Sequence, residues 1–198
     1  IGEDNNNPPE EFVLKLENDP YYRWLTIATV PIHFIVLISI AWLIGTEPLS
    51  PVTIFILALI AGGSSGFGIN TAHELGHKNT KLEKWFAKIV LAVPAYGHFP
   101  IEHNRGHHTW VSTPEDHASS RMGESIYSFA IREMKGSFLR AIELEKKRLT
   151  NKKKEFWTIE NDILQSYALT IVLQLSLIYL FGWIMIPFLL VHNFWAWF

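Results

Sequence analysis

Three long apolar runs constrain this 198-residue chain more than any other feature of its sequence. They cover about residues 21–45, 51–71 and 163–181, and a fourth begins near 183 and continues to 198. About twenty apolar residues are needed for a helix to cross the hydrocarbon of a bilayer. Because unpaired backbone groups are costly in lipid, each run should be helical. The sequence therefore predicts an all-α integral membrane protein built as a transmembrane helix bundle.

The composition excludes several kinds of site. The chain has no cysteine, so disulfides, thiolate zinc sites, iron–sulfur clusters and a cysteine nucleophile are absent from it. Any metal must be held by nitrogen and oxygen. The formal net charge is −2, and no basic stripe suggests a nucleic-acid partner. The chain begins without Met and ends within an apolar run, so we interpret it as an internal fragment of a longer protein.

Four short polar motifs predict helix starts. They are Asp19-Pro20, Ser50-Pro51, Thr80-Lys-Leu-Glu83 and Thr113-Pro-Glu-Asp116. The first two combine an N-cap residue with proline at the first helical position, and the third has the pattern of a capping box. The first two apolar runs should therefore form a tight hairpin, with the connector 45–50 between them.

Positive charge orients this hairpin. The connector 45–50 has no lysine or arginine, whereas Lys78, Lys81 and Lys84 follow the second run. The positive-inside rule therefore places the end of the second run on the cytoplasmic side. The next apolar stretch, 85–101, is short for a span and contains a proline. We expect it to be re-entrant or interfacial, so that the chain returns to the cytoplasmic side.

Residues 102–162 form a polar cytoplasmic insert. Within it, one apolar helical stripe has spacings of three and four residues. Its members are Ile131, Met134, Phe138 and Ile142. We favour a helix packed on the protein over a helix lying independently on the membrane surface.

Two histidine boxes lie beside the apolar runs. They read His-Glu-Leu-Gly-His-Lys at 73–78 and Glu-His-Asn-Arg-Gly-His-His at 102–108. On an α-helix, His73 and His77 share one face, as do His103 and His107, so each pair could bind one ion. His108 would lie about 140° around the helix from His103 and could serve a second metal. Five imidazoles exceed the three of a catalytic zinc site, so we infer two metals.

Other polar residues near the boxes are weaker candidates. Glu74 and Glu102 flank histidines and could orient them or bind metal directly, and Lys78 and Arg105 are candidate partners for these carboxylates. His98 is a candidate to contact the metal ligands without binding the metal itself. We expect His117 to be exposed.

His33 and His192 lie alone in apolar runs, and we interpret both as structural.

The first box also matches the His-Glu-x-x-His pattern of zinc metalloproteases, with Glu74 as general base. An intramembrane zinc protease is therefore one alternative. The second box argues against it, because such an enzyme needs one further ligand and not three more histidines. A membrane protein that binds metal without catalysis is another alternative.

The two boxes and several further segments resemble the membrane-bound alkane 1-monooxygenases. The further segments are Asn-Asn-Pro-Pro-Glu-Glu at 6–11, Ala-Lys-Ile-Val-Leu-Ala-Val at 87–93, Tyr-Gly-His-Phe at 96–99 and Ser-Arg-Met-Gly-Glu-Ser-Ile-Tyr at 120–127. The resemblance covers essentially the whole chain. A wider kinship includes xylene monooxygenases and fatty-acid desaturases, so a desaturase or another lipid hydroxylase is a further alternative.

This resemblance implies a non-haem centre of two iron ions that uses O₂ to convert medium-chain alkanes to primary alcohols. It implies electrons from rubredoxin, reduced by an NADH-dependent rubredoxin reductase, and a place in the bacterial inner membrane with the active site toward the cytoplasm. By the same resemblance, the iron ligands here are His73, His77, His103, His107 and His108.

The resemblance implies six membrane spans in the family. It also implies two further histidine motifs, which this sequence lacks. We therefore expect about four spans, part of the ligand set and no activity from residues 1–198 alone.

Overall fold

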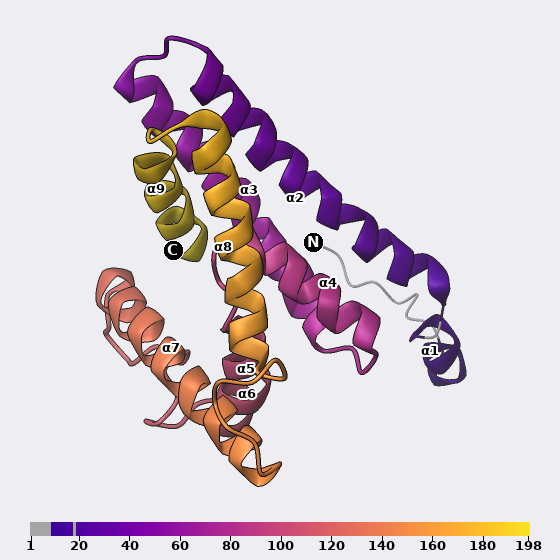
Figure 1. Cartoon of the computed structure of the whole chain (residues 1–198). Helices are drawn as coiled ribbons and strands as arrows, with labels where there is room; N and C mark the ends of the chain where they lie inside the picture. The colour runs from indigo at the N-terminus through magenta and orange to yellow at the C-terminus, as the bar shows by residue number, and fades with distance from the viewer. Residues whose placement is uncertain (1–8, 18) are drawn as a thin grey trace.

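The computed structural model describes residues 9–17 and 19–198, and the regular structure of these residues is entirely helical (Figure 1). The helices are α1 Glu10–Glu17, α2 Pro20–Thr46, α3 Pro51–Gly76, α4 Lys81–Ala92, α5 Phe99–Glu102, η1 His103–His107, α6 His108–Trp110, α7 Ile126–Asn151, α8 Asp162–Phe181 and α9 Met185–Trp197. Helix η1 is a single π-helical segment. The predicted all-α fold is confirmed.

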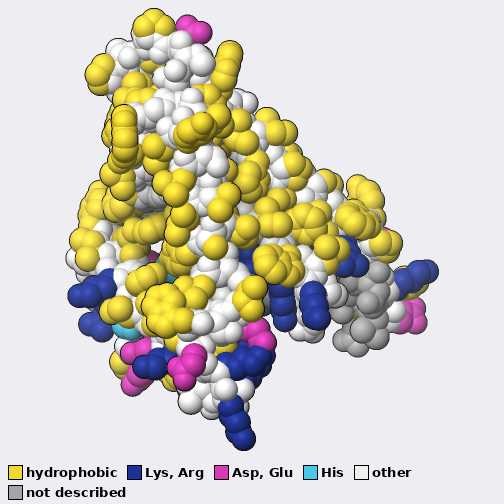
Figure 2. Space-filling view, viewed as in Figure 1, with side chains coloured by type: hydrophobic (Ala, Val, Ile, Leu, Met, Phe, Trp, Pro, Cys, Tyr) yellow, Lys and Arg dark blue, Asp and Glu magenta, His cyan; other side chains and the backbone are white. Residues whose placement is uncertain are grey.

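Among the described residues, three helices are long and apolar enough to cross a membrane. They are α2, α3 and α8, with 27, 26 and 20 residues and mean hydropathies of 2.3, 2.0 and 1.7 in their most apolar windows. In Figure 2 hydrophobic side chains cover this part of the molecule, while most charged side chains gather at its other end. The predicted membrane bundle is thus confirmed. Helix α9 has 13 residues, so a fourth span at 183–198 stays a prediction.

Helix α3 lies at the centre of the bundle, between α2, α4 and α9. Six of its seven buried positions are small, which lets neighbouring helices approach closely. The six are Ala58, Ala61, Gly62, Ser65, Gly68 and Ala72, and the seventh is Leu75. Ser65 Oγ lies 2.8 Å from His192 Nε2, and the His33 ring lies against Gly68. Both histidines are buried between helices, in agreement with a structural role.

Three of the four predicted helix starts are present. The side chains of Asp19 and Ser50 accept hydrogen bonds from the backbone N–H groups of the helices that follow. Helix α4 begins at Lys81 after Thr80, as predicted, but without the capping box: Thr80 makes no side-chain cap bond, and Glu83 pairs with Arg23 at 2.6 Å. The helix start predicted at 113–116 is wrong, since this segment forms turns and the next helix begins at 126.

The stretch 85–101 turns back on itself. Helix α4 ends at Ala92, and Ala95 has a φ of +57°, a left-handed conformation that reverses the chain. Trp197 Nε1 donates a hydrogen bond of 2.6 Å to the Pro94 carbonyl at this turn. The chain then reaches the second box through α5. The position of 85–101 relative to the membrane stays a prediction.

Helix α7 packs on α5 and η1, so the favoured interpretation of a helix packed on the protein is confirmed. The predicted stripe is only partly buried. Ile131 is 72% exposed, whereas Ile142 packs against a buried apolar cluster and the Phe138 ring contacts His98 and Tyr167. The fully buried positions of the helix are Gly136, Ser137, Ala141, Glu145 and Leu149.

Candidate metal centre

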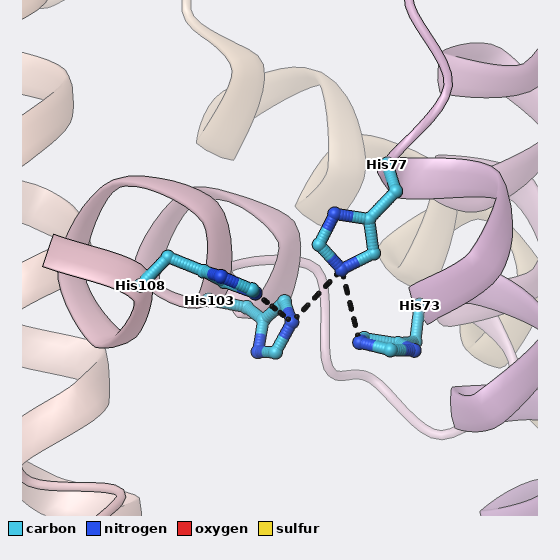
Figure 3. Close-up of side chains that lie close together, drawn as sticks. All are labelled: His73, His77, His103 and His108. Atoms are coloured by element: carbon cyan, nitrogen blue, oxygen red, sulfur yellow. Dashed lines mark hydrogen bonds between the residues drawn. The ribbon is translucent and has the colours of Figure 1, made fainter. Parts of the chain in front are cut away.

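The structure brings the two histidine boxes together, as a shared site requires. His73 and His77 come from the C-terminal end of α3, and His103 and His108 from η1 and α6 (Figure 3). His77 Nε2 lies 3.0 Å from His73 Nε2 and 3.2 Å from His103 Nε2. His108 Nε2 lies 3.0 Å from His103 Nε2. One nitrogen from each ring lies within 4.8 Å of the others, so the four can face one metal ion.

The π-helical segment decides which histidines of the second box point to this cluster. The His108 backbone N–H donates to the carbonyl of His103, five residues earlier. This wider turn brings residues i and i+5 together, where an α-helix would bring i and i+4. The predicted pairing of His103 with His107 was therefore wrong, and His108 shares the cluster with His103. Single π turns inside helices are frequent at functional sites.

His107 lies beside the cluster with a separate partner. Its ring centroid is 5.5 Å from that of His103 and 5.7 Å from that of His108. Its Nδ1 lies 2.8 Å from Oδ2 of Asp116, a side chain with no solvent exposure. Sequence reasoning missed Asp116, because its motif looks like a helix start and its contact with His107 depends on the turn at 111–119. The role of His107 as a ligand stays a prediction.

The two glutamates of the boxes differ in burial. The side chain of Glu74 is 65% exposed, and its Oε1 lies 3.3 Å from His73 Nδ1. Glu102 is 3% exposed, and its Oε1 has no hydrogen-bond partner among the described residues. Burial raises the pKa of Glu102 to about 7, against the opposing effect of Arg140. Glu102 is thus the better placed of the two to respond to a bound cation.

Arg105 pairs elsewhere than expected. Its Nη1 donates to Glu145 Oε2 at 3.2 Å, and not to either box glutamate. Glu145 also accepts bonds from Arg148 Nε at 2.7 Å and from the backbone N–H of Asp162 at 2.7 Å. These contacts join the second box to α7 and to the first residue of α8.

Burial and mutual repulsion favour the neutral form of two clustered imidazoles, His77 and His103. The pKa of His103 falls to about 3, mainly through burial and then through the neighbouring histidines. Burial, followed by repulsion from His73, also lowers the pKa of His77. A neutral imidazole has a free lone pair, which is the form that binds a metal. An all-imidazole set suits iron, zinc, copper or nickel.

The remaining histidines lie outside the cluster. His98 is buried, with its Nδ1 2.8 Å from the Tyr167 hydroxyl. His117 was predicted to be exposed, but its ring is half-buried and packs closely against Gly136.

Comparison with known proteins identifies the relatives of this site. The sequence model of the family described as fatty acid desaturase matches residues 49–198, which include both boxes. The chain belongs to the fatty acid desaturase family. Within that family it is 52% identical to an alkane 1-monooxygenase from Ectopseudomonas oleovorans and 50% identical to alkane 1-monooxygenase 1 from Alcanivorax borkumensis. Each alignment covers this whole chain and 49% of the relative.

A more distant relative is the xylene/toluene monooxygenase hydroxylase component of Pseudomonas putida. It is 30% identical over 146 residues, which are 74% of this chain and 34% of the relative. The chain thus spans about half the length of the alkane 1-monooxygenases it matches. The resemblance to alkane 1-monooxygenases is confirmed. For this desaturase-family chain, the histidine cluster and the family together indicate a non-haem iron site.

Proposed function

We propose that the full-length protein catalyses the O₂-dependent terminal hydroxylation of medium-chain alkanes to primary alcohols. The observation that carries this proposal is the convergence of four imidazole nitrogens within 4.8 Å, two of them from the end of α3, a helix long enough to span a membrane. Sequence identity of 50–52% to alkane 1-monooxygenases supports the choice of substrate class.

The donor set fits iron. We propose that His73, His77, His103 and His108 hold one ion and that His107 contributes to a second, with Glu102 as an additional ligand or a group that orients one. Glu74 could orient His73 through its Nδ1. When bound, the iron pair supplies the activation of O₂ that attack on an alkane C–H bond requires, which redox-inactive zinc cannot supply. Further ligands would come from residues outside 1–198.

The residues of this chain have a positioning role in that chemistry. In their neutral form the imidazoles would offer lone pairs to the metal, and the buried Glu145 holds the second box against α7 and α8. We propose that an alkane reaches the site laterally, without crossing water, from the lipid around the apolar helices α2, α3 and α8.

We further propose that electrons come from rubredoxin, reduced by NADH through rubredoxin reductase, and that the site faces the cytoplasm of a bacterial inner membrane. The lysines at positions 78, 81 and 84, next to the first box, support this orientation.

The test is conversion of octane to 1-octanol by membranes containing the full-length protein, supplied with rubredoxin, its reductase and NADH. Conversion should require O₂ and should be lost in His77→Ala. Purified protein that contains zinc and no iron would overturn the proposal. A desaturase would instead give an unsaturated product without added oxygen, and the family match makes that outcome worth measuring in the same assay.

A further inference from the structure

The hydrogen bond between His107 and Asp116 separates His107 from the other four box histidines. Asp116 Oδ2 accepts from His107 Nδ1 at 2.8 Å, and the carboxylate is fully shielded from solvent. The other four rings direct nitrogens toward one another. A ring whose Nδ1–H is bound to a carboxylate has its lone pair on Nε2.

The turn at 111–119 fixes both oxygens of this carboxylate. Oδ1 accepts from the backbone N–H of Ala118 at 3.1 Å. Oδ2 accepts from Ser119 Oγ at 2.5 Å as well as from His107. The carboxylate is thus held in one orientation.

We propose that Asp116 is a positioning residue that fixes the tautomer and orientation of His107, so that Nε2 is presented to the second metal ion. This proposal rests on the proposed function, because it assumes that metal binds at the boxes. A carboxylate on the far nitrogen of a ligand histidine orients the ring and strengthens its donor nitrogen.

Asp116→Asn tests this idea with little change in shape. The Ala118 N–H requires an oxygen at the Oδ1 position, so the amide nitrogen replaces Oδ2 and donates to His107 Nδ1. His107 must then carry its proton on Nε2, which blocks metal binding there. Glu115→Gln is the matched control, because it makes the same carboxylate-to-amide change at the exposed neighbouring residue of the same turn.

The experiment titrates metal-free, full-length protein with Fe(II) in competition with a coloured chelator. Wild-type protein should bind two ions. In Asp116→Asn one ion should keep its wild-type affinity, while the other weakens by about 10- to 100-fold. Glu115→Gln should bind both ions like the wild type. In a His107→Ala background, adding Asp116→Asn should cause no further loss, because both changes act on the same ligand.

Several results would overturn the proposal. Unchanged binding of both ions by Asp116→Asn would show that the carboxylate does not act through His107. Equal weakening in Glu115→Gln, or a further loss in the His107→Ala background, would assign Asp116 a role only in the structure of the turn. If wild-type protein binds no Fe(II), the proposed function itself fails, and this inference fails with it.

Discussion

Replacing Glu145 by glutamine should destabilise the helical region that supports the second box. The carboxylate is completely buried and accepts bonds from two arginines and a helix N-terminus. Removing one partner of a buried ion pair costs about 3–5 kcal/mol, because the other charge stays buried. Here Arg148 keeps a bond of 2.6 Å to the Glu160 carbonyl, and the Arg105 side chain is 42% exposed. We therefore expect the lower value, about 3 kcal/mol.

Thermal unfolding of the full-length protein in detergent measures this cost. For 150–250 residues, 1 kcal/mol shifts the Tm by about 2–4 °C, and the shift per kcal/mol falls as chain length grows. A full-length protein about twice as long as this chain should therefore lose about 3–6 °C in Tm for a destabilisation of about 3 kcal/mol. Glu143→Gln is the matched control, since Glu143 lies two residues away on the exposed side of α7. If the two variants unfold within about 1 °C of each other, the buried carboxylate does not stabilise this region as argued.

Three further predictions concern the metal site and its supports. His77→Ala should remove most bound iron, because Nε2 of His77 contacts both His73 and His103. Asn79→Ala, in the exposed turn nearby, should retain the iron, and elemental analysis measures both. Gly106→Ala should lower folded yield and iron content, because a Cβ there would lie 2.6 Å from Glu102 Oε1. Gly63→Ala should be tolerated, because the atom nearest to its added Cβ would lie 3.7 Å away. Burial lowers the pKa of His98 from 6.5 to about 4. The unfolded chain therefore takes up a proton on His98 at a higher pH than the folded chain, and the folded state loses stability as the pH falls from 6.5 to about 4. His98→Gln should therefore flatten the acid loss of stability between pH 6.5 and 4, and an unchanged slope would contradict the assignment.

Local sequence determines the parts of the fold that were predicted. The caps at Asp19 and Ser50 depend on neighbouring backbone N–H groups, and the apolar runs depend on the bilayer as solvent. The pair His73 and His77 follows from ordinary helical spacing on α3. The return of 85–101 to the side it started from was predicted from its short length and its proline. This return allows both boxes to share one site.

The remaining features depend on tertiary contacts that no local pattern records. A π-helical turn replaces the expected α-helix at 103–107, and it exchanges His107 for His108 in the cluster. Asp116 was assigned to a helix start because its hydrogen bond to His107 requires a turn whose path is set by its own side-chain bonds. Glu145 looks like a solvated charge on a polar helix, and only its ion pairs across three elements explain its burial.

The metal content of the purified full-length protein tests the central claim most directly. We predict about two iron ions per chain, with loss of iron in His77→Ala and retention in Asn79→Ala. Stoichiometric zinc without iron, or iron that persists undiminished in His77→Ala, would contradict an iron site assembled from both histidine boxes.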